Sequence, residues 1–157
     1  MTSAHSSDDV AGALGRAILT TESDAIIASD RDGMITFWNP GAQRIFGQSA
    51  AEAVGQSLDI IIPERLRDAH WTGYSEVMRT GRSKYGSDDL LSVPGIGKDG
   101  QRIALEFTIV PLTDAEGRMA GTAAILRDVT ARFEETKALR RRLADANRLA
   151  PANPSAG

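Results

Sequence analysis

Cysteine is absent from this 157-residue chain, and histidine occurs only at His5 and His70. Without thiols, the chain has no disulfide scaffold, no thiolate metal site and no cysteine nucleophile. Two histidines, one of them in a polar N-terminal segment, also exclude a multi-histidine zinc centre. His70 is therefore the one histidine in the body of the chain.

Long apolar runs are also missing. No run approaches the about 20 residues that cross a bilayer, and the first ten residues lack the basic and apolar parts of a secretory signal. We therefore expect a cytoplasmic protein without membrane contacts. Residues 130–149 carry six basic and three acidic side chains although the whole chain has a net charge of −3. The body is thus acidic, which argues against a nucleic-acid-binding surface there.

The composition is that of a globular protein, with 41% hydrophobic and 25% charged residues. The length suits one domain with short appendages. The predicted organisation is a disordered tail (1–9), an N-terminal amphipathic helix (10–19), one domain (20–130), a C-terminal helix (131–150) and a disordered tail or linker (151–157).

The body is predicted to contain five strands and one long helix, with short helices before the long one. Asn39 followed by Pro40 marks the start of the first short helix, and Gly81 follows the last turn of the long one. The predicted strands are 25–30, 34–38, 84–93, 102–112 and 119–129, and the long helix is 64–80. This order predicts an α+β fold, in which helices pack on one face of a five-stranded antiparallel sheet.

One face of the long helix is apolar apart from a histidine. The residues that share this face at helical spacing are Leu66, His70, Tyr74, Val77 and Met78. His70 is therefore expected to point toward the interior. A neutral imidazole there is a suitable iron ligand, but a lone buried histidine is also commonly a hydrogen-bonded core residue. The sequence offers no nucleophile–base pair, metal cluster or phosphate loop, so we do not expect an enzyme.

Several short motifs follow one another in a fixed order. They are Asp30-Arg31-Asp32-Gly33-Met34-Ile35, Trp38-Asn39-Pro40-Gly41-Ala42, Phe46-Gly47, Val54-Gly55, Lys98-Asp99-Gly100 and Ile125-Leu126-Arg127-Asp128-Val129-Thr130. Over residues 16–130 this set resembles the PAS sensor-domain family. The resemblance implies a PAS fold with sheet order 2-1-5-4-3 and a signalling role with output through the C-terminal helix.

The place of His70 on the long helix resembles that of the proximal histidine in the haem-binding oxygen sensors of this family. This implies haem b between the sheet and the long helix, with His70 as the iron ligand. At the position of Lys84 those sensors carry a residue that binds a haem propionate, and Lys84 could serve in the same way. At the position of Glu76 they carry an arginine that helps to hold a propionate, which Glu76 would repel. Leu90 or Leu91 stands where those sensors carry a distal arginine. An apolar side chain there cannot donate a hydrogen bond to bound dioxygen, so CO, NO or redox sensing is favoured over stable oxygen binding. Flavin adduct chemistry is not expected, because the family's flavin photosensors need a cysteine.

The residues expected to bind or surround the cofactor are His70, Trp71, Tyr74, Val77, Lys84, Leu90, Leu91, Ile103, Leu105, Ile109 and Ile125. The alternative is a cofactor-free PAS module that dimerises and relays signals mechanically to an effector. We also expect a homodimer held through the terminal helices, because both helices carry apolar side chains that need a surface to pack on. An effector or kinase domain is the expected output partner.

Overall fold

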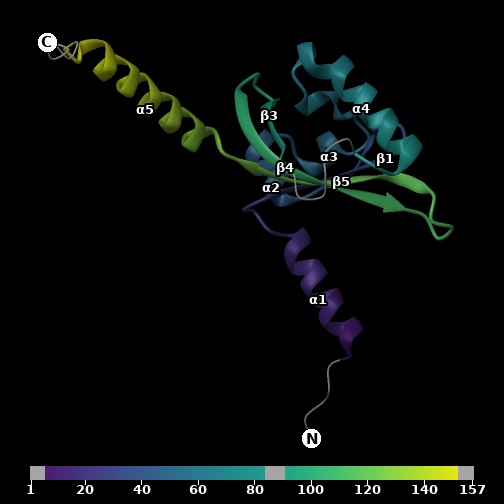
Figure 1. The fold of residues 1–157 in the computed structure, drawn as a ribbon. Coiled ribbons are helices and arrows are strands. Elements are labelled where there is room, and N and C mark those ends of the chain that lie inside the picture. The colour runs from purple at the N-terminus through teal and green to yellow at the C-terminus, as the bar shows by residue number, and fades with distance from the viewer. Residues whose placement is uncertain (1–5, 84–90, 152–157) are drawn as a thin grey trace, which may run out of the picture.

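The computed structural model describes residues 6–83 and 91–151 and contains one five-stranded antiparallel sheet with the order β2-β1-β5-β4-β3 (Figure 1). This confirms the predicted fold class and strand order. The strands are β1 (Ala25–Asp30), β2 (Ile35–Trp38), β3 (Leu91–Ile96), β4 (Arg102–Thr113) and β5 (Met119–Asp128). Strand β3 extends beyond the predicted end at residue 93, because its pairing with β4 continues to Ile96 opposite Arg102. The predicted portion at 84–90 lies outside the described residues.

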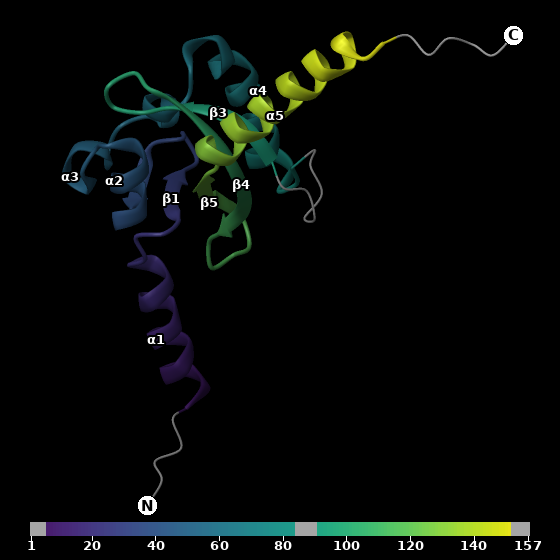
Figure 2. The same ribbon diagram turned by 90° about the vertical axis from the view of Figure 1, so that its left-hand side faces the viewer.

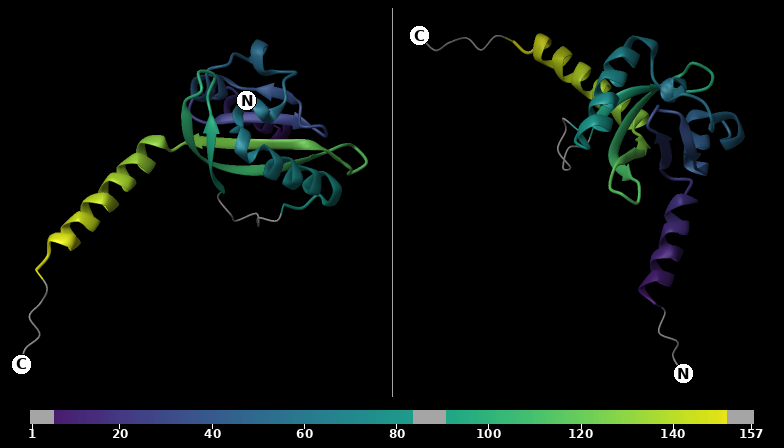
Figure 3. Two further views of the ribbon diagram at one scale, coloured as in Figure 1. Left: turned by 90° about the horizontal axis from the view of Figure 1, so that it is seen from above. Right: turned by 90° about the vertical axis from the view of Figure 1, so that its right-hand side faces the viewer.

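The helices divide into a group that covers the sheet and two that leave it. They are α1 (Ser7–Leu19), α2 (Pro40–Phe46), α3 (Ala50–Ala53), α4 (Arg67–Thr80) and α5 (Thr130–Leu149), with 3-10 turns at Leu58–Ile61 and Glu64–Leu66. Helices α2, α3 and α4 lie with the sheet, whereas α1 and α5 project away from it in different directions (Figures 2 and 3). None of the helices in the described ranges is both long and apolar enough to cross a bilayer.

Local capping explains where these helices begin and end. Helix α1 starts at Ser7, three residues earlier than predicted, because Ser6 and Asp9 form a capping box. The predicted helix over 64–80 is broken, since a 3-10 turn precedes α4 and the α-helical part begins at Arg67. It ends at Gly81, whose φ of 70° is the left-handed conformation that glycine adopts most readily.

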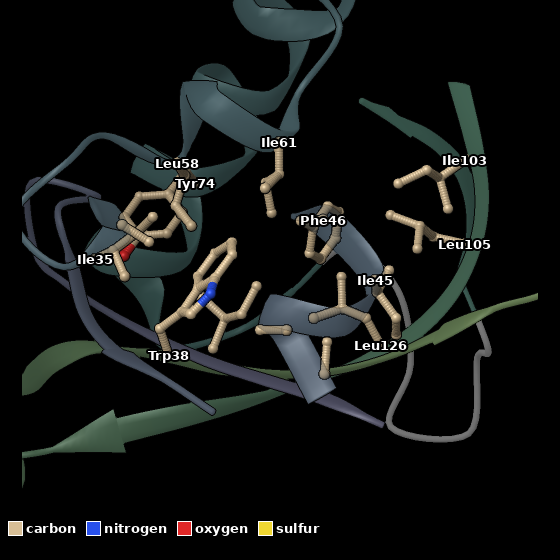
Figure 4. Packing of buried hydrophobic residues seen from close by; sticks show 14 of the residues in the cluster. Ile35, Trp38, Ile45, Phe46, Leu58, Ile61, Tyr74, Ile103, Leu105 and Leu126 are labelled. Atoms are coloured by element: carbon tan, nitrogen blue, oxygen red, sulfur yellow. The ribbon is translucent and has the colours of Figure 1, made fainter. Parts of the chain in front are cut away.

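The hydrophobic core lies between the sheet and helices α2 to α4 (Figure 4). Its larger side chains are Ile27, Ile35, Trp38, Ile45, Phe46, Leu58, Ile61, Tyr74, Met78, Ile103, Leu105 and Leu126. Side chains alternate along a strand, so the neighbours of Ile27 and Leu126, which are Ile26 and Ile125, lie on the other face of the sheet.

Candidate functional site

His70 lies in the first turn of α4, on the helix that covers the sheet. The side chain is half-buried, and its Nδ1 atom is fully buried without a hydrogen-bond partner. Its ring packs edge-on against Trp71 with centroids 4.7 Å apart, and the ring of Tyr74 lies at 5.8 Å. Buried polar nitrogens are normally paired, so this atom is a hydrogen-bonding and ligating group that the described structure leaves unpartnered.

Burial lowers the pKa of His70, because the protein interior disfavours the charged imidazolium. The negative charge of Asp59 opposes this shift without reversing it. The imidazole is therefore neutral at pH 7, which is the form that binds iron.

This pKa shift predicts how the stability of the cofactor-free protein responds to acid. Because the folded pKa lies below the unfolded value of 6.5, the unfolded chain binds more protons near that pH. The contribution of His70 to stability is complete above pH 6.5 and is lost as the pH falls through the folded pKa. In urea unfolding, His70→Phe should lose less stability than the wild type between pH 7 and pH 5. His5→Ala should follow the wild type, and equal losses in all three proteins would contradict the assignment.

Trp71 anchors the start of α4 to the turn between β1 and β2. Its indole Nε1 donates to Asp59 Oδ1 at 2.8 Å. Its ring covers Gly33, where an added Cβ would lie 2.2 Å from the ring carbons. Gly33 also has a φ of 75°, so the turn needs glycine both for its backbone conformation and for the indole above it. The structure therefore places Trp71, predicted to surround the cofactor, against this turn.

Tyr74 links α4 to strands β1 and β5 through hydroxyl groups. Its Oη donates to the carbonyl of Asp30 and lies 2.9 Å from Ser29 Oγ on β1. Ser29 Oγ in turn lies 3.2 Å from Thr122 Oγ1 on β5. All three side chains are buried. Sequence reasoning missed this set of hydrogen bonds, although Ser29 and Thr122 lie at the core-facing spacing of Ile27 and Leu126 along their strands and could have indicated it.

The other predicted residues fall into three groups. Ile103 and Leu105 on β4 lie in the core, and Val77 packs against it. Leu91 on β3 is half-buried and pairs with Phe107 of β4. Lys84 and Leu90 lie outside the described residues.

Two predicted positions lie outside the core. Ile125 lies on the sheet face opposite the core, because its neighbour Leu126 occupies the core face. Ile109 follows the core-facing alternation of β4 but is 37% exposed and makes no part of the core. The sequence alone did not assign the two faces of β5, whereas on β4 the alternation holds but the core ends before Ile109.

The residues around His70 are chemically suited to haem, but the core side of α4 is packed with side chains. A neutral imidazole with a buried unpaired nitrogen suits an axial iron ligand. On the core side of α4, however, Tyr74 of this helix packs with Ile35 and Leu58 (Figure 4). Two surface hollows in the described structure are lined by Ser23, Asp24, Arg44, Arg127, Asp128, Thr130 and Ala131, and by Pro63, Glu64, Arg65, Gly95, Ile96 and Arg102. Neither of these two hollows includes His70.

Comparison with known proteins gives matches to sensor proteins. A family model described as PAS fold matches residues 19–134. The signal transduction histidine-protein kinase AtoS of Escherichia coli is 33% identical over 134 residues, which is 85% of this chain and 20% of AtoS. The oxygen sensor protein DosP of the same organism is 29% identical over 119 residues, which is 73% of this chain and 14% of DosP. The chain therefore spans a small part of these relatives.

Among solved structures, a PAS domain from Colwellia psychrerythraea superimposes with a TM-score of 0.67 at 23% identity. The match covers 78% of this chain and 99% of that domain. At this level of identity the likeness concerns the fold, and it agrees with the strand order described above.

Proposed function

This chain belongs to the PAS family, and we propose that it is a sensor domain that holds haem b through His70 and responds to a diatomic gas or to redox state. The observation that carries the proposal is the buried, unpaired Nδ1 of a neutral imidazole on the helix that covers the sheet. His70 is the one histidine among the described residues. The similarity to an oxygen sensor protein supports the choice of a gas as the signal.

In this proposal, residues of α4 and β4 have distinct roles. His70 would supply the axial bond to iron, and the haem would supply gas binding or electron transfer. The apolar side chains of Ile103 and Leu105 would contact the porphyrin from the sheet. Trp71 and Tyr74 would hold α4 through their hydrogen bonds.

Glu76 is compatible with this site despite its negative charge. Its carboxylate pairs with Arg79, at 2.7 Å between Arg79 Nη2 and Glu76 Oε1. This pairing lowers the pKa of Glu76 through the hydrogen bond from Arg79. The ion pair also places a compensating positive charge beside Glu76, so the repulsion of a propionate is reduced.

The output path would run from β4 and β5 into α5. The backbone N–H of Val129 donates to the carbonyl of Ala104 at 2.8 Å, and the N–H of Ala104 donates to Thr130 Oγ1 at 3.0 Å. Arg132 of α5 also pairs with Glu106 of β4. Because these contacts hold the start of α5 against β4, a shift of the sheet would move this helix as well. We propose an effector or kinase domain as the recipient, and self-association through the terminal helices.

Titration of the purified chain with hemin tests the proposal. We expect one saturable Soret band at a ratio of one haem per chain, because one histidine is available in the domain. A chain that gains no band would overturn the haem assignment and leave the cofactor-free relay module as the function.

Arginine introduced on β3 should slow the loss of dioxygen from the ferrous protein. Leu91 is half-buried and pairs with Phe107 on the side of the core. A guanidinium there, or at Leu90, would donate a charge-assisted hydrogen bond to the bound ligand. Such bonds contribute about 1.5–3 kcal/mol, so the off-rate measured by stopped flow should fall about tenfold or more. Ser92→Arg, on the exposed opposite face of the same strand, is the control. Unchanged rates in both leucine variants would show that neither side chain faces the iron.

A further inference from the structure

Among the residues that the structure describes, Tyr74 is the one member of α4 whose side chain is hydrogen-bonded to a strand. The other side-chain hydrogen bonds of α4 stay near the helix itself or reach back to residues 59–62. Val77 and Met78 also pack toward the sheet, but apolar packing has no preferred direction. The position of α4 along the strands is therefore set mainly by the hydroxyl of Tyr74.

The directions of the hydrogen bonds around Tyr74 follow from the single proton that each hydroxyl carries. A carbonyl only accepts, so the proton of Tyr74 is used on the carbonyl of Asp30. Ser29 must then donate to Tyr74. Thr122 must donate to Ser29, because the proton of Ser29 is already used. These residues form a one-way hydroxyl chain that runs from β5 through β1 to α4 and ends on the carbonyl of Asp30.

The two strands approach each other closely where this hydroxyl chain crosses them. Ser29 and Thr122 are directly opposite in the pairing of β1 with β5, and Asp30 and Gly121 are the next pair. A Cβ on Gly121 would lie 1.9 Å from the carbonyl oxygen of Ser29, so this approach requires glycine. The side chains of Ser29, Tyr74 and Thr122 are at most 8% exposed. A hydrogen bond lost here would leave a buried polar group unpaired.

We propose that the hydroxyl chain Thr122–Ser29–Tyr74 ties the position of α4 to β5, the strand that continues into α5. His70 lies one turn before Tyr74, with ring centroids 5.8 Å apart, so a ligand that moves His70 moves Tyr74 as well. Tyr74 is thus a positioning residue for His70. The nature of the signal rests on the proposed function, whereas the connection itself belongs to the chain without cofactor.

Double-variant cycles in urea unfolding test the connection. Tyr74→Phe and Thr122→Val each remove one hydroxyl, and the two hydroxyls are joined only through Ser29. The rise in the unfolding equilibrium constant of the double variant should be at least about twofold below the product of the two single effects. In a Ser29→Ala background the two effects should multiply. Multiplying effects in the wild-type background, or an unchanged deviation without the Ser29 hydroxyl, would overturn the proposal.

Thr108→Val is the matched control for these cycles. Thr108 is exposed and lies on β4, opposite Ile125 of β5, so it takes no part in the hydroxyl chain. Its effect on the unfolding equilibrium constant should multiply with that of Tyr74→Phe, with or without the Ser29 hydroxyl. A deviation as large as that of Thr122→Val would mean that the cycle reports general destabilisation, and the proposal would fail.

Backbone amide chemical shifts measure the transmission itself, which a purely stabilising role would not move. His70→Ala should shift the amide resonances of β5 around Thr122, and this response should be at least about twofold smaller in a Ser29→Ala background. Thr122→Ser keeps a hydroxyl and should keep the response, whereas Thr122→Val should weaken it. These last two variants decide the question even if Ser29→Ala does not fold. Equal responses in Thr122→Ser and Thr122→Val would show that α4 acts on the sheet by packing alone and would overturn the proposal.

Both measurements use the chain without cofactor, so they are separate from the hemin titration. Coupling in a chain that gains no Soret band would support the hydroxyl connection and reject only the haem assignment. A Soret band in a chain whose Tyr74 and Thr122 effects multiply would keep the haem assignment and overturn the connection.

Discussion

Replacement of His70 by alanine is expected to abolish the Soret band that hemin gives with the wild-type chain. We propose His70 as the iron ligand, because the chain has no cysteine and its other histidine is His5. Among the described residues, no group of three or more His, Cys, Asp or Glu side chains could hold a metal instead. The loss should be complete in an absorbance titration at equal hemin concentrations.

Two matched proteins show whether the loss comes from the ligand or from the fold. His5→Ala should keep the wild-type band. His70→Gly should lose it and regain it when imidazole is added to the solution, since the free ligand can then occupy the space of the side chain. A sharp band that persists in His70→Ala would reject His70 as the ligand, and hemin would then be held elsewhere.

The order of strands and helices along the chain follows from local patterns because each turn has its own chemistry, whereas the sheet order 2-1-5-4-3 is implied by the resemblance to the PAS family. Gly33 in the first hairpin and the Asn39-Pro40 helix start separate the first two strands from the helices. The alternation of Ile103 and Leu105 with polar neighbours assigns the core face of β4 correctly. These features depend on residues close in sequence, so a single chain is enough to predict them.

The candidate site was less predictable because its contacts join distant segments. Ile125 and Leu126 are adjacent apolar residues, and only the pairing of β5 with β1 and β4 decides which of them faces the core. The contact of Trp71 with Gly33 joins a helix to a turn 38 positions earlier in the chain. Periodicity predicts the face of a helix, but not which partner that face meets.

Asn39→Leu is expected to cause the largest loss of stability of any substitution considered for this chain. Asn39 is 2% exposed. Its Oδ1 accepts from the N–H groups of Ile26 and Ala42 at 2.8 and 2.9 Å, and its Nδ2 donates to two carbonyls of segment 20–24. One side chain thus joins β1, α2 and the segment that follows α1.

Leucine has a similar size to asparagine but cannot satisfy these four backbone groups. An unpaired buried polar group costs about 1–3 kcal/mol, and partial access of water to the two carbonyls reduces the sum. The free energy of unfolding should therefore fall by about 3–5 kcal/mol, measured by urea denaturation with an unchanged m-value. Asn147→Leu, the same substitution on the exposed face of α5, should change it by less than about 0.5 kcal/mol. If the two variants unfold at the same urea concentration, the amide of Asn39 does not hold these segments together.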